Sequence, residues 1–172
     1  MNTISKNLRF NFMNLGPVIL LYTLSITEVD TEFSNLFEIL SFKLQIIIIY
    51  YWTLKDSTIL GTGHIFASGI INDVVMGLPL GISAISYLIV AFVALYVKNI
   101  TVNFSIFTDW FSFILAIFFS NLVFLILIYN FTEFTIKYLD IFYNAFFTFL
   151  FFPFVWFAFN IYKSLMMVRR DD

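Results

Sequence analysis

The chain has 172 residues, of which 61% are hydrophobic and only 12% are charged. Too little polar surface remains to coat a water-soluble globule, so the composition predicts an integral membrane protein. The formal net charge of −2 disfavours a nucleic-acid partner, and the lack of cysteine together with a single histidine excludes thiolate and histidine-cluster metal sites.

The length accommodates about six membrane spans of about 20 residues joined by short connections. Hydropathy places these spans near residues 10–26, 36–54, 58–76, 80–97, 107–129 and 138–162. We therefore predict an all-α, polytopic membrane helical bundle that occupies residues 1–172 as a single domain.

Prolines and one irregular span add detail to this outline. Gly16-Pro17 is expected either to kink the first span or to mark its first turn, and Pro153 predicts a bend near Phe149 in the sixth. The second span is unusual because its dense apolar run covers only residues 46–52. We interpret it as a tilted helix, or as an interfacial helix followed by a short span.

The distribution of basic residues predicts the orientation. With six spans both termini share one side, and seven of the nine basic residues fall there: Lys6, Arg9, Lys55, Lys98, Lys163, Arg169 and Arg170. Only Lys43 and Lys137 lie opposite. Because short cytoplasmic loops carry an excess of Lys and Arg, both termini are predicted to be cytoplasmic.

The third span and the turn after it hold the most distinctive residues. Gly69, Asp73 and Gly77 recur every four residues and share one helix face, while Gly63 and Ala67 form a small-xxx-small pair. Small residues let another backbone approach closely, so we expect this helix to meet other helices rather than lipid.

Asp73 lies in the last turn of its helix, which is the unfavourable end for an anion. It is expected to need a partner, and three interpretations remain open. Asp73 could be a boundary acid that reaches water or caps the turn to the next helix, a packing or coupling residue that faces other helices or a partner subunit, or a proton or ion carrier. His64, in the same span, is interpreted as a satisfied core or interface group rather than a ligand.

The residues of this region resemble those of a known family. An aromatic pair is followed by the pattern G-x-x-F-x-x-G-x-x-x-D-x-x-x-G-x-P-L-G, formed here by Tyr51-Trp52 and then Gly63, Phe66, Gly69, Asp73, Gly77, Pro79, Leu80 and Gly81. In this motif, in length and in span number, the chain resembles the MreD rod-shape-determining membrane proteins.

The resemblance implies a non-enzymatic, multi-pass scaffold of the bacterial inner membrane that helps to maintain rod shape. Its partners would be membrane lipid, a bitopic MreC-like protein and, directly or indirectly, MreB-like filaments and peptidoglycan synthases. No cofactor, metal or catalytic residue is implied. The expected docking residues for a partner helix are Gly63, Gly69, Asp73, Gly77, Pro79 and Gly81.

A second interpretation comes from another functional class. The resembled family is similar in architecture to the six-span substrate-binding subunits (S-components) of vitamin or metal uptake transporters. Such a subunit requires an outward-facing pocket with convergent polar groups and a tightly bound small molecule. A third class, an isolated channel or proton pathway, would be revealed by flux into liposomes.

Overall fold

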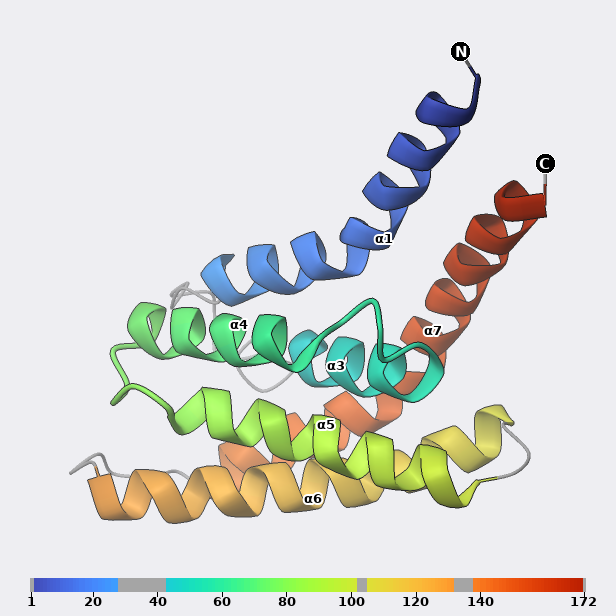
Figure 1. Ribbon diagram of the computed structural model, residues 1–172. Helices are drawn as coiled ribbons and strands as arrows, with labels where there is room; N and C mark the ends of the chain where they lie inside the picture. The colour runs from blue at the N-terminus through green and yellow to red at the C-terminus, as the bar shows by residue number, and fades with distance from the viewer. Residues whose placement is uncertain (1, 28–42, 102–104, 132–137, 172) are drawn as a thin grey trace.

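The structure, a computed structural model, describes residues 2–27, 43–101, 105–131 and 138–171. These residues form helices and connecting turns without a strand, which confirms the predicted all-α bundle (Figure 1). The helices are α1 (Asn2–Thr27), α3 (Leu44–Lys55), α4 (Thr62–Val75), α5 (Ile82–Ile100), α6 (Ile106–Phe131) and α7 (Tyr138–Asp171).

Three of these helices are long and apolar enough to cross a bilayer: α5, α6 and the Leu139–Leu165 part of α7. By contrast, α3 and α4 contain 12 and 14 residues. At 1.5 Å per residue they measure about 18 and 21 Å, less than the roughly 30 Å of a hydrocarbon core. The helix of the predicted second span begins only at Leu44, and residues 36–42 lie outside the described part of the chain.

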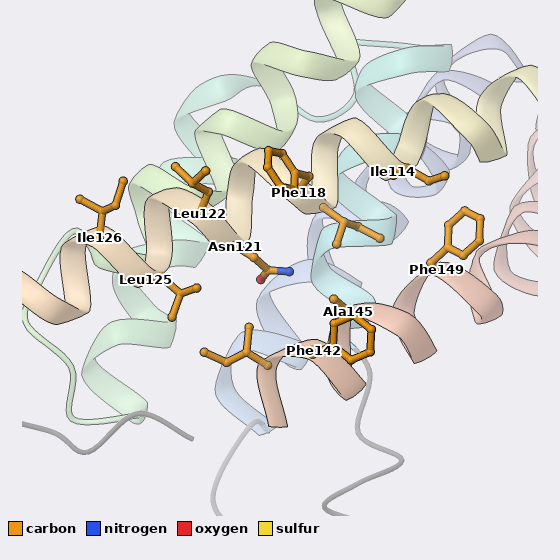
Figure 2. A pocket seen from close by; sticks show the side chains of 11 residues that line it. Ile114, Phe118, Asn121, Leu122, Leu125, Ile126, Phe142, Ala145 and Phe149 are labelled. Carbon is orange, nitrogen blue, oxygen red and sulfur yellow. The ribbon is translucent and has the colours of Figure 1, made fainter. Parts of the chain in front are cut away.

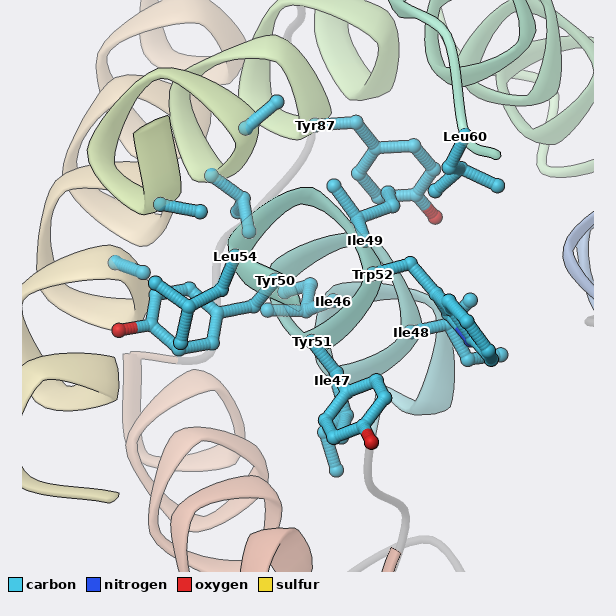
Figure 3. Close-up of a cluster of buried hydrophobic side chains, with 14 of the residues drawn as sticks. Ile46, Ile47, Ile48, Ile49, Tyr50, Tyr51, Trp52, Leu54, Leu60 and Tyr87 are labelled. Carbon is cyan, nitrogen blue, oxygen red and sulfur yellow. The ribbon is translucent and has the colours of Figure 1, made fainter. Parts of the chain in front are cut away.

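The short helix α3 forms the centre of the molecule. Every residue from Gln45 to Leu54 is buried, and Figure 3 shows its side chains projecting on all sides of the helix. A helix that is hydrophobic around its whole circumference requires neighbours on every side. Helices α1, α5, α6 and α7 supply them, so α3 is a core helix of the bundle.

The two outer helices α1 and α7 both contain a proline, at Pro17 and Pro153. Both bend in Figure 1, and the start of α1 and the end of α7 lie at the same end of the molecule. They touch where the Tyr162 hydroxyl occupies the space that a side chain at Gly16 would need. Pro17 therefore lies inside the first helix and does not begin it.

Candidate functional site

The turn between α4 and α5 has the geometry that its glycines and proline predict. Gly77 and Gly81 adopt φ of +65° and +108°, where a side chain would be strained. The amide of Leu78 donates to the Asp73 carbonyl at 2.9 Å, and the amide of Gly77 donates to the Val74 carbonyl at 3.3 Å. This is a Schellman motif, which ends α4 and satisfies its last carbonyls before Pro79.

The carboxylate of Asp73 caps the following helix. It has no exposed surface, and its two oxygens accept hydrogen bonds from the amides of Gly81 and Ser83, each at 2.7 Å. These amides belong to the start of α5, where the helix dipole favours a negative charge. Of the interpretations left open by the sequence, these contacts match a residue that caps the next helix; partner docking by Asp73 stays a prediction.

Gly69 sets the distance between α4 and α5. A Cβ added there would overlap the Cα of Ala84 and lie 2.6 Å from its backbone nitrogen. The face that carries Gly69 and Asp73 therefore packs against α5 of the same chain. Gly63 differs, because no described atom lies within 4 Å of an added Cβ at that position.

Another face of α4 has no contact with described residues comparable to that between Gly69 and α5. Gly63, Phe66 and Val74 are exposed, and Ala67 and Ile70 are half-buried. At 100° per residue these five positions span about 100° of the helix circumference, and Asp73 borders this arc on the side of Phe66. We call them the open face of α4, and the predicted docking residues thus divide between this face and the internal contact with α5.

His64 joins α4 to α1. Its Nδ1 atom lies 3.1 Å from the hydroxyl of Tyr22, and the two rings meet edge to face. The side chain is exposed, and among the described residues its polar contact is the Tyr22 hydroxyl. Its position is that of an interface group between two helices.

A buried ion pair lies at the opposite end of the hairpin from Asp73. The Nζ of Lys55, at the end of α3, lies 2.6 Å from Oδ2 of Asp109 in the first turn of α6. Trp156 of α7 donates its indole N–H to the same oxygen at 2.9 Å. Asp109 is fully buried, so three helices converge on one carboxylate.

Further polar contacts surround this ion pair. The hydroxyls of Tyr50 and Ser112 lie 2.7 Å apart, Lys163 donates to the backbone carbonyl of Lys55 at 3.4 Å, and Lys98 contacts Ser57 at 3.3 Å. Three of the four lysines that the sequence assigns to one side, Lys55, Lys98 and Lys163, therefore gather at one end of the bundle. Asp109 was not among the candidate residues predicted from the sequence. The feature that could have identified it is an acidic residue within an apolar run.

Two cavities in the described part of the chain differ in size and lining. The larger is an apolar groove of about 620 Å³ between α6 and α7. Figure 2 shows its side chains facing a common space, with Asn121 as the polar group among them. The smaller is a polar cavity of about 50 Å³ between α4, α5 and α6, which Asn72, Ser83, Ser86 and Ser120 help to line.

Comparison with models of known protein families, with curated proteins and with solved structures finds no match to this chain. Within the described residues, no group of three or more His, Cys, Asp or Glu side chains is placed to hold a metal ion.

Proposed function

We propose that this chain is a non-enzymatic, multi-pass scaffold of the bacterial cell-elongation machinery. In this proposal it lies in the inner membrane with both termini in the cytoplasm. It binds a bitopic MreC-like protein and thereby helps to connect MreB-like filaments with the peptidoglycan synthases that extend the lateral wall.

The main support is that four of the motif residues, Gly69, Asp73, Gly77 and Gly81, form one structural unit. Gly69 permits the close approach of α5, Asp73 caps α5, and Gly77 and Gly81 take the left-handed conformations that the turn needs. The residues that resemble the MreD pattern therefore include the four that build the hairpin between α4 and α5.

The proposed docking surface for the partner is the open face of α4. Gly69 and Asp73 are covered by α5, whereas no described atom lies within 4 Å of a Cβ added at Gly63. Gly63 and Ala67 would let the backbone of one partner helix approach closely, and the exposed Phe66 and Val74 would add apolar contact. The occupant that we assign to this face is the single membrane-spanning helix of the MreC-like protein.

Depletion of the protein in its source bacterium, followed by microscopy and pull-down, tests the proposed function. We expect rod-shaped cells to become round and the MreC-like partner to be captured with the chain. Cells that keep their rod shape after full depletion would contradict the proposal.

Site-specific crosslinking tests the docking surface. Since the chain has no cysteine, a single Phe66→Cys substitution reports one position without background. We expect it to crosslink to a cysteine in the partner's membrane helix. Phe111→Cys, on α6 and exposed to 62%, is the matched control and should not crosslink. Equal crosslinking at both positions would mean that the open face of α4 is not the docking surface.

The cavities give less support to the alternative function, that of a substrate-binding subunit of a vitamin or metal uptake transporter. Sites for drug-sized ligands usually have about 300–1,000 Å³ and a few convergent polar groups. The groove between α6 and α7 is large enough but offers Asn121 as its polar lining residue, and the polar cavity of about 50 Å³ is too small for a vitamin. Thermal stabilisation by vitamins, or by a cobalt or nickel salt, would favour the alternative.

A further inference from the structure

The polar cavity between α4, α5 and α6 contains a buried amide that is only half satisfied. Asn72 is 5% exposed, and its Nδ2 donates to Ser83 Oγ at 3.2 Å. Its Oδ1 has no hydrogen-bond partner among the described residues. Exchanging the two amide atoms would leave the nitrogen unpaired instead, so either assignment demands one more partner.

The serines around the cavity present acceptors toward it. Ser86 Oγ donates its proton to the Ile82 carbonyl at 2.9 Å, and Ser120 Oγ donates to the Ser86 carbonyl at 3.2 Å. Each hydroxyl has one proton and two lone pairs, so these two retain only acceptor capacity. Together with Asn72 Oδ1 they offer acceptors, while Asn121 and Lys43, which also line the cavity, carry N–H donors. The lining therefore suits a small molecule that both donates and accepts hydrogen bonds.

The volume and the charge of the cavity limit which small molecules can bind in it. About 50 Å³ is room for a few waters, since one water needs roughly 10–15 Å³. Lys43 also lines the cavity, with its ammonium 4.4 Å from the centre of the Phe124 ring. A fixed positive charge at the wall disfavours a second cation, and both oxygens of the neighbouring Asp73 are already bonded to amides.

We propose that this cavity holds ordered water, bound to the Asn72 amide and to the serine hydroxyls of α5 and α6. The water links the α4–α5 hairpin to the middle of α6, a helix that otherwise presents mainly apolar side chains. Removing such water leaves buried polar groups unpaired, so the site fixes the position of α6 against the hairpin.

X-ray hydroxyl-radical footprinting in nanodiscs, read by mass spectrometry, tests this proposal because bound water generates radicals next to the side chains that it touches. Tyr87 lines the cavity and is 4% exposed, whereas Tyr51 is fully buried and is not among the lining residues. We expect Tyr87 to be oxidised several-fold faster than Tyr51. Equal, low rates for the two tyrosines would overturn the proposal.

Variants identify the groups that hold the water. Asn72→Leu should lower the oxidation of Tyr87 to the level of Tyr51. Ser68→Ala is the control, because the Ser68 hydroxyl donates to the Ile65 carbonyl outside the cavity, and it should leave Tyr87 unchanged. If Asn72→Leu does not fold, Ser120→Val replaces it as the test. Unchanged oxidation of Tyr87 in the folded variant would overturn the assignment to these groups.

Salt distinguishes water from a bound cation. The oxidation of Tyr87 should be the same in sodium, potassium and choline chloride at equal ionic strength. Selective loss of Tyr87 oxidation in sodium or potassium would identify a cation site and overturn the proposal for water. None of these measurements depends on a partner protein, so they do not test the scaffold function.

Discussion

Asp73 is an anion with no exposed surface in an apolar bundle, and its position is favourable only because of where α5 begins. The two amides that it accepts from are unpaired at the start of any α-helix. The carboxylate satisfies them, while the α5 dipole stabilises the negative charge. The dipole of α4 disfavours a negative charge in its last turn. The amides and the dipole at the first turn of α5 offset this cost.

Asp73→Leu should therefore destabilise the protein. We expect a loss of about 1–3 kcal/mol in the free energy of unfolding, because two buried amides lose their acceptor. Asp73→Asn retains one carbonyl acceptor and should lose less. Denaturant unfolding in mixed micelles measures both, and insertion into the membrane should be unaffected.

The partner interaction provides a second measurement on the same variant. We expect weaker copurification of the MreC-like partner with Asp73→Leu, since a loosened hairpin would displace the open face of α4. A variant that is as stable as the wild type and copurifies equally would contradict the role of Asp73 as a cap and its effect on docking.

Gly69 and Gly63 offer a matched pair of glycines on one helix. Gly69→Ala should lower stability by about 1–3 kcal/mol, because the new methyl group meets the backbone of Ala84 and forces α4 away from α5. Gly63→Ala meets no described atom and should be neutral or slightly stabilising, since alanine favours the helix. Denaturant unfolding compares the two.

A second substitution, at Ala84, tests which atoms limit the approach of the two helices. Adding Ala84→Gly to Gly69→Ala should not restore stability, because the two nearest atoms are the Cα and the backbone nitrogen of Ala84. Full rescue would show that only the side chain of Ala84 limits the approach of the helices.

Among the elements, α3 combines an apolar interior with a charged end. Its 12 residues are enclosed by four helices, and Lys55 at its end meets Asp109 and Trp156. Burying two charges costs desolvation energy that their attraction must offset. Oδ1 of Asp109 has no hydrogen-bond partner among the described residues, so the cluster positions α3, α6 and α7 at an energetic cost.

A double-mutant cycle on this ion pair should show strong coupling. Lys55→Met or Asp109→Leu alone removes the opposite charge from this buried pair, and we expect each to cost about 3–5 kcal/mol. The double variant should be more stable than either single variant, because it leaves no charge behind. Unfolding of all four proteins under the same conditions measures the coupling.

Lys98→Met is the control for the ion-pair cycle. Lys98 is half-buried and contacts Ser57 at 3.3 Å, so its replacement should cost less than about 1 kcal/mol. Additive losses in the Lys55 and Asp109 double variant would contradict direct coupling.

At the scale of the whole molecule, the lysines define one end of the bundle. Lys55, Lys98 and Lys163 lie near one another, and the start of α1 and the end of α7 also lie together (Figure 1). That both termini face the cytoplasm stays a prediction, based on the excess of basic residues on that side.

Cysteine labelling tests the orientation with a pair of exposed asparagines. Asn130→Cys, at the outer end of α6 in the proposed orientation, should react with an impermeant maleimide in cells whose outer permeability barrier has been removed. Asn99→Cys, near the end of α5, should react only after the membrane is opened. The reverse pattern would place the termini outside.

The sequence by itself determined the class of protein and the outline of its helices. Long apolar runs indicate helices wherever they occur, so the expected spans 80–97 and 107–129 correspond to Ile82–Ile100 and Ile106–Phe131. The need for glycine at the α4–α5 turn is similarly local, since left-handed backbone angles favour it at Gly77 and Gly81.

Only the tertiary structure decided which groups meet. It paired Asp73 with the amides of α5, Lys55 with Asp109, and Gly69 with Ala84. It also made the predicted second span a buried core helix. These features depend on contacts between residues that hydropathy and helical periodicity treat independently, because a periodic pattern specifies which face of a helix is apolar or polar but not which other helix covers it.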